Sequence, residues 1–309
     1  MPAFAEPAID PPLADSYRAL LRSDQLRRGG IAPAPASESV AVLERALPMI
    51  DLKRLTSGDA GERKACADAM ATAASEWGFF QVINHDVGRE LLEEMRREQA
   101  RLFRLPFDTK EKAGLLNGSY RWGNPTATSL RHLSWSEAFH VPLASISRED
   151  CDYGKLSSLR YPACPFAPDT FGLVPHTDSD FLTILCQDQV GGLQLMKDSR
   201  WVAVKPRSDA LIVNIGDLFQ AWSNNRYKSV EHKVVANAKA ERLSVAYFLC
   251  PSYDSPVGTC GEPSPYRPFT FGEYRRKVQD DVKRTGKKIG LPNFLKQSPV
   301  DAMNHGLCF

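Results

Sequence analysis

Short apolar runs, each closed by Gly, Pro, Asn or Asp, dominate the chain from Tyr161 onward. Their length is that of single strands. The clearest of these runs are residues 181–185, 192–196, 201–205, 210–217 and 243–249. Many short strands with turn signals between them predict an antiparallel sandwich or jelly roll.

Helical spacing of apolar residues occurs outside these runs, at residues 62–76, 90–103 and 271–285. Two further strands are predicted at residues 49–52 and 79–84. The expected fold class is therefore mainly β with flanking helices, arranged as a distorted double-stranded β-helix (jelly roll).

Four regions are expected along the chain. Residues 1–47 form a flexible N-terminal arm with a short helix at 14–28, because a loose Gly- and Pro-rich stretch follows that helix. Residues 48–160 form an N-terminal region of helices and strands, residues 161–300 the jelly-roll core, and residues 301–309 a tail.

Composition excludes some classes of function. The chain has 309 residues, a net charge of +2 and a pI near 8.1, which gives no electrostatic reason to expect nucleic acid or an anionic membrane as a partner. Seven cysteines without a C-x-x-C pair predict reduced thiols. No apolar stretch approaches the ~20 residues of a membrane span, and residues 1–7 lack a secretory signal pattern, so the cytoplasm is the expected location. Oligomeric state is left open.

The most informative polar pattern is His176-x-Asp178, followed far downstream by His232. His176 and Asp178 precede a predicted strand, and residues i and i+2 of an extended segment point to the same side. Two imidazoles and one carboxylate on one face of a metal leave three positions open, as non-haem Fe(II) oxygenases require. The remaining histidines are interpreted as ordinary hydrogen-bonding residues, although His140 could face the pocket.

A second pattern, Arg242-x-Ser244, opens the predicted strand at 243–249. The same period of two places a planar guanidinium beside a hydroxyl, which suits one end of a dicarboxylate. Phe248 falls on the same face, where it either lines a pocket or packs in the core.

These motifs, together with Tyr161-Pro162-Ala163-Cys164-Pro165 and the run from Trp77 to His85, resemble the plant 2-oxoglutarate-dependent dioxygenases. The resemblance extends from about Leu47 to Leu295. It implies Fe(II) bound by His176, Asp178 and His232, with 2-oxoglutarate and O2 as cosubstrates and ascorbate as reductant. It also implies that Arg242, Ser244 and Tyr161 contact 2-oxoglutarate.

Within that family, the segments around Tyr120, Leu133 and Asp10 are similar to those of gibberellin 2-oxidases, most of all the group that acts on C20 gibberellins. The implied reaction is 2β-hydroxylation, which inactivates the hormone. Arg121 or Arg131 could receive the gibberellin carboxylate. The alternatives are another gibberellin position, a flavonoid substrate, or a catalytically impaired form.

The last alternative arises from a departure between Leu143 and Tyr161. Relatives of this kind have a long outer helix there and an asparagine two places before the tyrosine, where this chain has Leu159. The flanking residues match, so an internal loss is expected. An apolar sheet face left uncovered would cost about 25 cal/mol for each Å² exposed.

Overall fold

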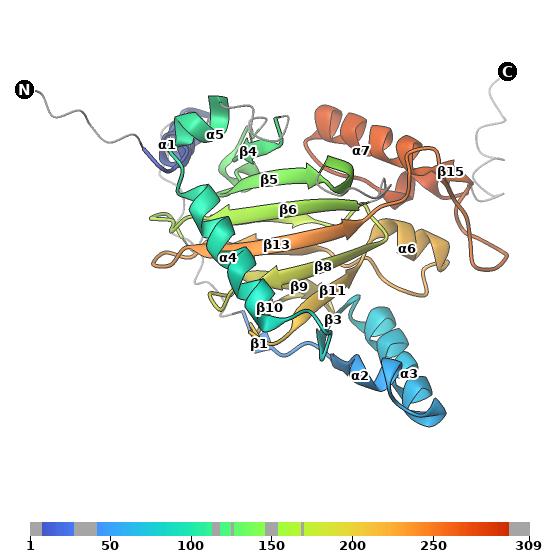
Figure 1. Ribbon diagram of the computed structural model, residues 1–309. Coiled ribbons are helices and arrows are strands. Elements are labelled where there is room, and N and C mark those ends of the chain that lie inside the picture. Colours follow the sequence, from blue (N-terminus) through green and yellow to red (C-terminus); the bar gives the residue numbers. More distant parts are fainter. Residues whose placement is uncertain are drawn as a thin grey trace, which may run out of the picture.

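The computed structural model describes residues 8–27, 42–112, 118–124, 127–145, 154–167 and 170–296 (Figure 1). The predicted tail at 301–309 and the loose part of the N-terminal arm lie outside the described residues. The helices are α1 (Leu13–Arg27), α2 (Lys53–Thr56), α3 (Ala60–Glu76), α4 (Arg89–Phe103), α5 (Phe107–Lys112), α6 (Asp217–Trp222) and α7 (Phe271–Thr285), with 3-10 turns η1 (Leu130–His132), η2 (Leu143–Ser145) and η3 (Leu291–Phe294).

Two sheets face each other and form the jelly roll, as the sequence predicts. The larger sheet has eight strands: β2 (Met49–Asp51), β3 (Phe79–Ile83), β11 (Leu211–Ile215), β8 (Leu182–Gln187), β13 (Arg242–Leu249), β6 (Gly154–Tyr161), β5 (Glu137–Pro142) and β4 (Tyr120–Trp122). The smaller has five: β1 (Glu44–Arg45), β10 (Arg200–Val204), β9 (Leu193–Lys197), β12 (His232–Val235) and β7 (Phe171–His176). A short pair, β14 (Pro256–Val257) and β15 (Phe269–Thr270), lies outside both.

The space between the sheets is filled by apolar side chains from both inner faces. Leu193, Leu195 and Val234 from the smaller sheet pack with Phe79 and Ile212 from the larger one, and each is at least 95% buried. Sheets of a sandwich pack about 10 Å apart, so alternate residues of each strand are sufficient to close this layer. The metal site described below lies beside this core.

Helices cover the outer face of the larger sheet. Figure 1 shows α4 crossing that face, with α6 and α7 grouped near one end of its strands. The sequence specifies α7 at both ends: the Thr270 side chain and Glu273 form a capping box, and Gly286 ends the helix with a positive φ of 72°. The predicted helix at 271–285 is confirmed at the same bounds.

The described part of the N-terminal arm is docked against the rest of the molecule, which differs from the expected flexible arm. Leu13 is 2% exposed, and the ring of Tyr17 stacks on Phe166 at 3.9 Å. Asp10 forms an ion pair with Arg160 of β6 at 2.6 Å. Apolar residues of α1 therefore have a packing partner that local sequence does not reveal.

A buried ionic cluster joins this arm to the larger sheet. Glu137 has no exposed side-chain surface and binds Lys110 at 2.8 Å and Arg160 at 2.6 Å. The hydroxyl of Tyr120 donates to the same carboxylate at 2.5 Å. Arg160 also pairs with Glu241, the residue before β13. The cluster thus joins one end of β6 to the adjacent end of β13. The residues expected to contact 2-oxoglutarate lie on these two strands: Tyr161 on β6, and Arg242 and Ser244 on β13.

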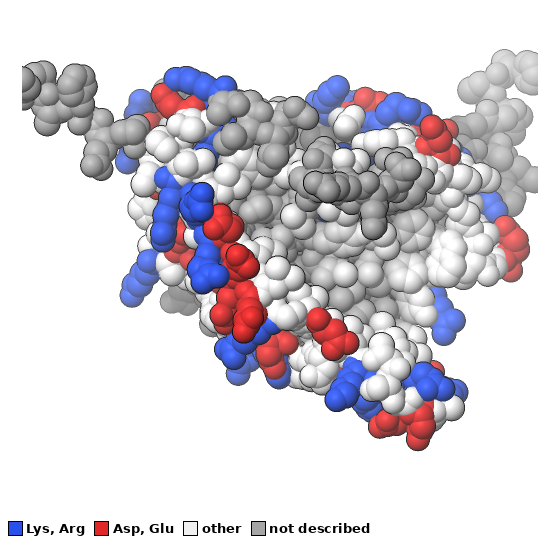
Figure 2. Space-filling view, in the orientation of Figure 1, with Lys and Arg blue, Asp and Glu red and all other residues white. Residues whose placement is uncertain are grey.

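An apolar groove of about 580 Å³ lies on the outer face of the larger sheet, between α3 and strands β3, β8 and β11. Its walls include Met70, Phe80, Ile184, Val213 and Phe219. Figure 2 shows charged side chains along α4 and α3 with a broad uncharged surface between them. Met70, Ile184 and Phe219 in these walls are partly exposed, whereas Phe80 and Val213 are buried.

Candidate metal and cosubstrate site

The two candidate metal-binding histidines are brought together by strand pairing. His176 is the last residue of β7, His232 is the first of β12, and the two are direct partners in the antiparallel register. Their ring centres are 4.4 Å apart. Cross-strand register therefore joins residues that are more than fifty positions apart in the sequence.

Both imidazoles are oriented in the same way. Nδ1 of His176 lies 2.8 Å from the Val174 carbonyl, and Nδ1 of His232 lies 3.0 Å from the Val230 carbonyl. A ring nitrogen that donates to a carbonyl leaves Nε2 available as a ligand. The two Nε2 atoms lie 3.5 and 3.7 Å from Oδ1 of Asp178, and the three ligand atoms fall within 4.8 Å of one another.

The second oxygen of Asp178 is held by two buried donors. The Thr183 hydroxyl of β8 donates to Oδ2 at 2.6 Å, and the Asn214 amide of β11 donates to it at 2.8 Å. Burial raises the pKa of Asp178, but His232, His176 and the Thr183 hydrogen bond together hold that pKa well below its usual value. The carboxyl group of Asp178 is consequently ionised, and its Oδ1 is directed toward the two imidazoles.

The protonation states also suit a metal. Burial, followed by the charge of His176, lowers the pKa of His232 to about 4, so this imidazole is neutral at pH 7. Metal ligation requires a neutral imidazole and an ionised carboxylate. Among the described residues, no other group of histidine, cysteine and carboxylate side chains has such an arrangement. The donor set fits Fe(II) with three open positions.

Arg242 and Ser244 lie on β13, on the inner face of the larger sheet. Arg242 is 2% exposed as a whole residue. Its guanidinium donates to Ser244 at 3.1 Å and Gln187 at 2.9 Å, and lies 4.9 Å from the ring centre of Tyr161. Its Nε has no hydrogen-bond partner among the described residues, and no described carboxylate pairs with it. A buried cation without an acid partner fits the distal carboxylate of a dicarboxylic cosubstrate.

Three polar residues at the site were missed in the sequence analysis: Thr183, Asn214 and Gln99. The buried Gln99 amide of α4 donates to the carbonyls of Ser244 at 2.8 Å and Leu159 at 3.2 Å, so it joins two neighbouring strands. Thr183 and Asn214 are polar residues within otherwise apolar strands. That interruption is the signal that could have identified them.

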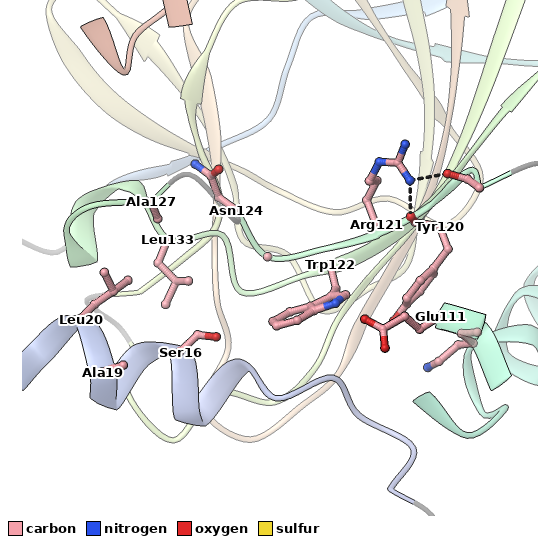
Figure 3. A pocket seen from close by; sticks show the side chains of 13 residues that line it. Ser16, Ala19, Leu20, Glu111, Tyr120, Arg121, Trp122, Asn124, Ala127 and Leu133 are labelled. Atoms are coloured by element: carbon pink, nitrogen blue, oxygen red, sulfur yellow. Dashed lines mark hydrogen bonds between the residues drawn. The ribbon is translucent and has the colours of Figure 1, made fainter. Parts of the chain in front are cut away.

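The candidate substrate residues are separated from one another. Phe248 lines the metal pocket together with Leu159, the residue at the expected asparagine position. Arg131 is exposed on η1. Arg121 lines a different cavity of about 810 Å³, together with Trp122 and residues of α1. Figure 3 shows its guanidinium bonded to the backbone oxygens of Gly118 and Tyr120.

A site of two histidines and one carboxylate inside a jelly roll defines the class of non-haem Fe(II) oxygenases. Residues 152–251 match the 2OG-Fe(II) oxygenase superfamily, and residues 47–155 match the N-terminal family of a non-haem dioxygenase in morphine synthesis.

Among the described helices, none combines the length and the apolar character that a membrane span requires.

Relatives with closely similar sequences refine this class. Gibberellin 2-beta-dioxygenase 6 of Oryza sativa subsp. japonica is 71% identical, with 97% of this chain and 100% of the relative covered. Gibberellin 2-beta-dioxygenase 8 of Arabidopsis thaliana is 49% identical, with 93% and 99% covered. The chain belongs to the gibberellin 2-beta-dioxygenase family within the 2OG-Fe(II) oxygenase superfamily. Fe(II) and 2-oxoglutarate are therefore its cofactor and cosubstrate.

Solved structures agree with the fold. A crystal structure of JOX2 in complex with 2OG, Fe and JA has a TM-score of 0.68 at 26% identity, covering 94% of this chain and 100% of that chain. The dioxygenase for auxin oxidation in rice has a TM-score of 0.65 at 28% identity, covering 81% and 100%.

The alignment with the rice relative also has an internal gap. It extends over 358 positions, whereas this chain has 309 residues. At least 49 positions of the relative, the difference between those lengths, therefore have no counterpart here. The sequence predicts such a loss between Leu143 and Tyr161.

Proposed function

We propose that this chain hydroxylates a gibberellin at C2, with Fe(II) held by His176, Asp178 and His232. The observation that carries the proposal is the 71% identity along the full length of the rice gibberellin 2-beta-dioxygenase, combined with the converging ligand atoms of these three residues. When bound, Fe(II) supplies the activation of O2 that is coupled to conversion of 2-oxoglutarate into succinate and CO2.

The chain's own contribution at the metal is geometric. The three ligands occupy one side of the site, so the opposite side stays open to cosubstrates. Thr183 and Asn214 fix the Asp178 carboxylate, and the backbone carbonyls of Val174 and Val230 fix the imidazoles. Such supporting contacts typically contribute about 10–100-fold in metal affinity or activity.

In this proposal the cosubstrate lies between the metal and β13. Arg242 binds the distal carboxylate of 2-oxoglutarate, Ser244 adds a hydroxyl, and Tyr161 packs against the guanidinium. The charge of Arg242 is already desolvated, because the side chain is 2% exposed. A carboxylate that pairs with it meets little competition from water, which strengthens the interaction. Phe248 and Leu159 add apolar side chains to the lining of the same pocket.

Other substrates of plant dioxygenases are the alternatives: a different gibberellin carbon or a flavonoid. A panel of C19 gibberellins, C20 gibberellins and flavonoids, followed by mass spectrometry of the products, separates them. The resemblance favours C20 gibberellins. Oxidation at a carbon other than C2 would contradict the proposed regiochemistry.

A second candidate is a shortened form that binds Fe(II) and 2-oxoglutarate without turnover. Three observations favour it: the gap of at least 49 positions, Leu159 beside the cosubstrate residues, and the apolar groove on the outer face of the larger sheet. An apolar side chain at 159 cannot form the hydrogen bonds of an asparagine.

One assay distinguishes the two candidates. Purified protein is incubated with Fe(II), ascorbate and 2-oxoglutarate, with or without a C20 gibberellin, and succinate is measured. Gibberellin-stimulated succinate release with formation of a 2β-hydroxylated product supports the enzyme. A folded protein that binds iron and 2-oxoglutarate but releases no succinate identifies the non-catalytic form.

A further inference from the structure

A lysine lies next to a residue of the metal pocket, on the face of the larger sheet that also bears Phe248. Lys155 of β6 is the direct partner of Phe248 in the antiparallel register. Residues directly opposite each other in such a pair have their side chains on the same face. The Lys155 ammonium lies 6.0 Å from the ring centre of Phe248, which lines the metal pocket. Lys155 therefore borders the space that a substrate would occupy.

Two neutral polar groups share this face. Ser157 lies two positions after Lys155 on β6, and His140 of β5 is the direct partner of Ser157 in the register. The Ser157 hydroxyl and Nδ1 of His140 are 2.7 Å apart. Burial lowers the pKa of His140 to about 4, and Lys155 and Arg121 contribute to the shift, so this imidazole is neutral at pH 7. The pair can offer hydrogen bonds without adding charge.

Positive charge gathers around Lys155. Burial lowers the pKa of Lys155, and the charges of Arg275 on α7 and Arg121 on β4 lower it further. Cys250 and the carboxyl of Asp180 raise this pKa, but Lys155 forms no ion pair or hydrogen bond with either of them or with any other described residue. A partly buried ammonium with cationic neighbours is costly unless an anion joins it.

We infer that Lys155 binds the carboxylate of the substrate, an apolar carboxylic acid, and that Ser157 and His140 offer additional hydrogen bonds to it. The inference rests on the proposed function, because gibberellins combine an apolar ring skeleton with a carboxylate. The skeleton then packs on Phe248 and the carboxylate reaches the ammonium. A charge-assisted hydrogen bond at one end of a rigid ring system determines which carbon faces the metal.

The arginines suggested by the sequence are less suited to this role. The Arg121 guanidinium already donates to two backbone carbonyls in the cavity near α1. Arg131 is exposed and does not line the metal pocket. In this arrangement Arg121 contributes positive electrostatic potential from a distance, and Lys155 contacts the substrate carboxylate directly.

Equilibrium binding tests the inference without requiring turnover. Isothermal titration calorimetry, with Mn(II) and 2-oxoglutarate present under anaerobic conditions, compares a C20 gibberellin with its fully methyl-esterified derivative. The unsubstituted chain is expected to bind the acid about 10–100-fold more tightly, the range for a hydrogen bond to a charged group. Lys155→Met is expected to lose most of this preference while retaining its affinity for the ester.

Lys197→Met is the matched control, because Lys197 is also partly buried beside an aromatic ring, 5.3 Å from the centre of Trp77, and lies on another sheet. It is expected to retain the preference for the acid. Equal affinity of acid and ester for the unsubstituted chain, including no binding of either, would overturn the inference. A preference that survives in Lys155→Met would also overturn it.

Turnover is measured separately on the same preparations. A Lys155-dependent preference without succinate release would preserve the inference and reject the enzymatic function. Gibberellin hydroxylation without a difference in affinity between acid and ester would support the enzymatic function and reject the inference about Lys155. In an active protein, Lys155→Met should raise KM for the acid more than it lowers kcat, because the contact is remote from the reacting carbon.

Discussion

The contact between Asn214 and Asp178 offers the sharpest test of how this site holds metal. Asp178 is 8% exposed, and its Oδ2 has two donors, Thr183 at 2.6 Å and Asn214 at 2.8 Å. Asn214→Ala removes one donor at a position where water has little access. The carboxylate then keeps a single anchor and can rotate away from the imidazoles.

The expected loss follows from the strength of that contact. Supporting hydrogen bonds of this kind are worth about 10–100-fold in metal affinity, or about 1.4–2.7 kcal/mol. Because Thr183 remains, Asn214→Ala should fall near the lower end of this range. The double variant Thr183→Val, Asn214→Ala should reach or exceed the upper end, since neither donor is left to orient Oδ2.

The assay is titration with Mn(II) at pH 7, with free Mn(II) measured by electron paramagnetic resonance. Urea unfolding of each variant verifies that the protein is folded under the titration conditions. Asn237→Ala is the control, because it removes an amide that only caps the backbone of Lys239 and Ala240 in a turn. If folded Asn214→Ala bound Mn(II) within twofold of the unsubstituted chain, the proposed support of Asp178 would be refuted.

Three further outcomes are expected. Glu137→Ala leaves Lys110 and Arg160 without their buried carboxylate and should cost about 3–5 kcal/mol in urea unfolding, whereas a loss below about 1 kcal/mol would show that the cluster is not stabilising. Arg242→Ala should raise KM for 2-oxoglutarate by at least tenfold with a smaller change in Mn(II) affinity, and an unchanged KM would remove Arg242 from the cosubstrate site. The pKa of His140 is lowered from 6.5 to about 4, chiefly by burial, so the unfolded chain binds more protons between these values. Stability should fall by up to about 3 kcal/mol as pH drops from 6.5 to 4, and His140→Gln should lack this part of the decrease, as measured by unfolding at each pH.

Much of the fold was predictable from local pattern. The helices predicted at 62–76, 90–103 and 271–285 correspond to α3, α4 and α7, with bounds that agree within two residues. Apolar periodicity and turn residues act over a few positions, so they are visible in one sequence. The jelly roll follows from the number and shortness of the strands.

The strand β6 was harder to predict. Its residues are mostly polar or small, and the preceding segment was expected to be too short for the family's pattern. In the structure β6 pairs with β13 along its whole length and with β5 from Lys155 to Arg160. Two neighbouring strands supply hydrogen bonds to the backbone whatever the side chains are, so tertiary context outweighs the weak local preference.

The sequence by itself determined the chemistry of the site. The two residues of each pair, His176 with Asp178 and Arg242 with Ser244, are two positions apart, and an extended backbone points such residues to the same side. Arg242 and Ser244 both lie on β13, whereas Asp178 lies just beyond the end of β7. Only the tertiary structure decided that Thr183 and Asn214 hold Asp178, and only it placed Lys155 beside Phe248. These contacts depend on register between strands that are distant along the chain. Register is set by packing of the whole sheet, which no local spacing encodes.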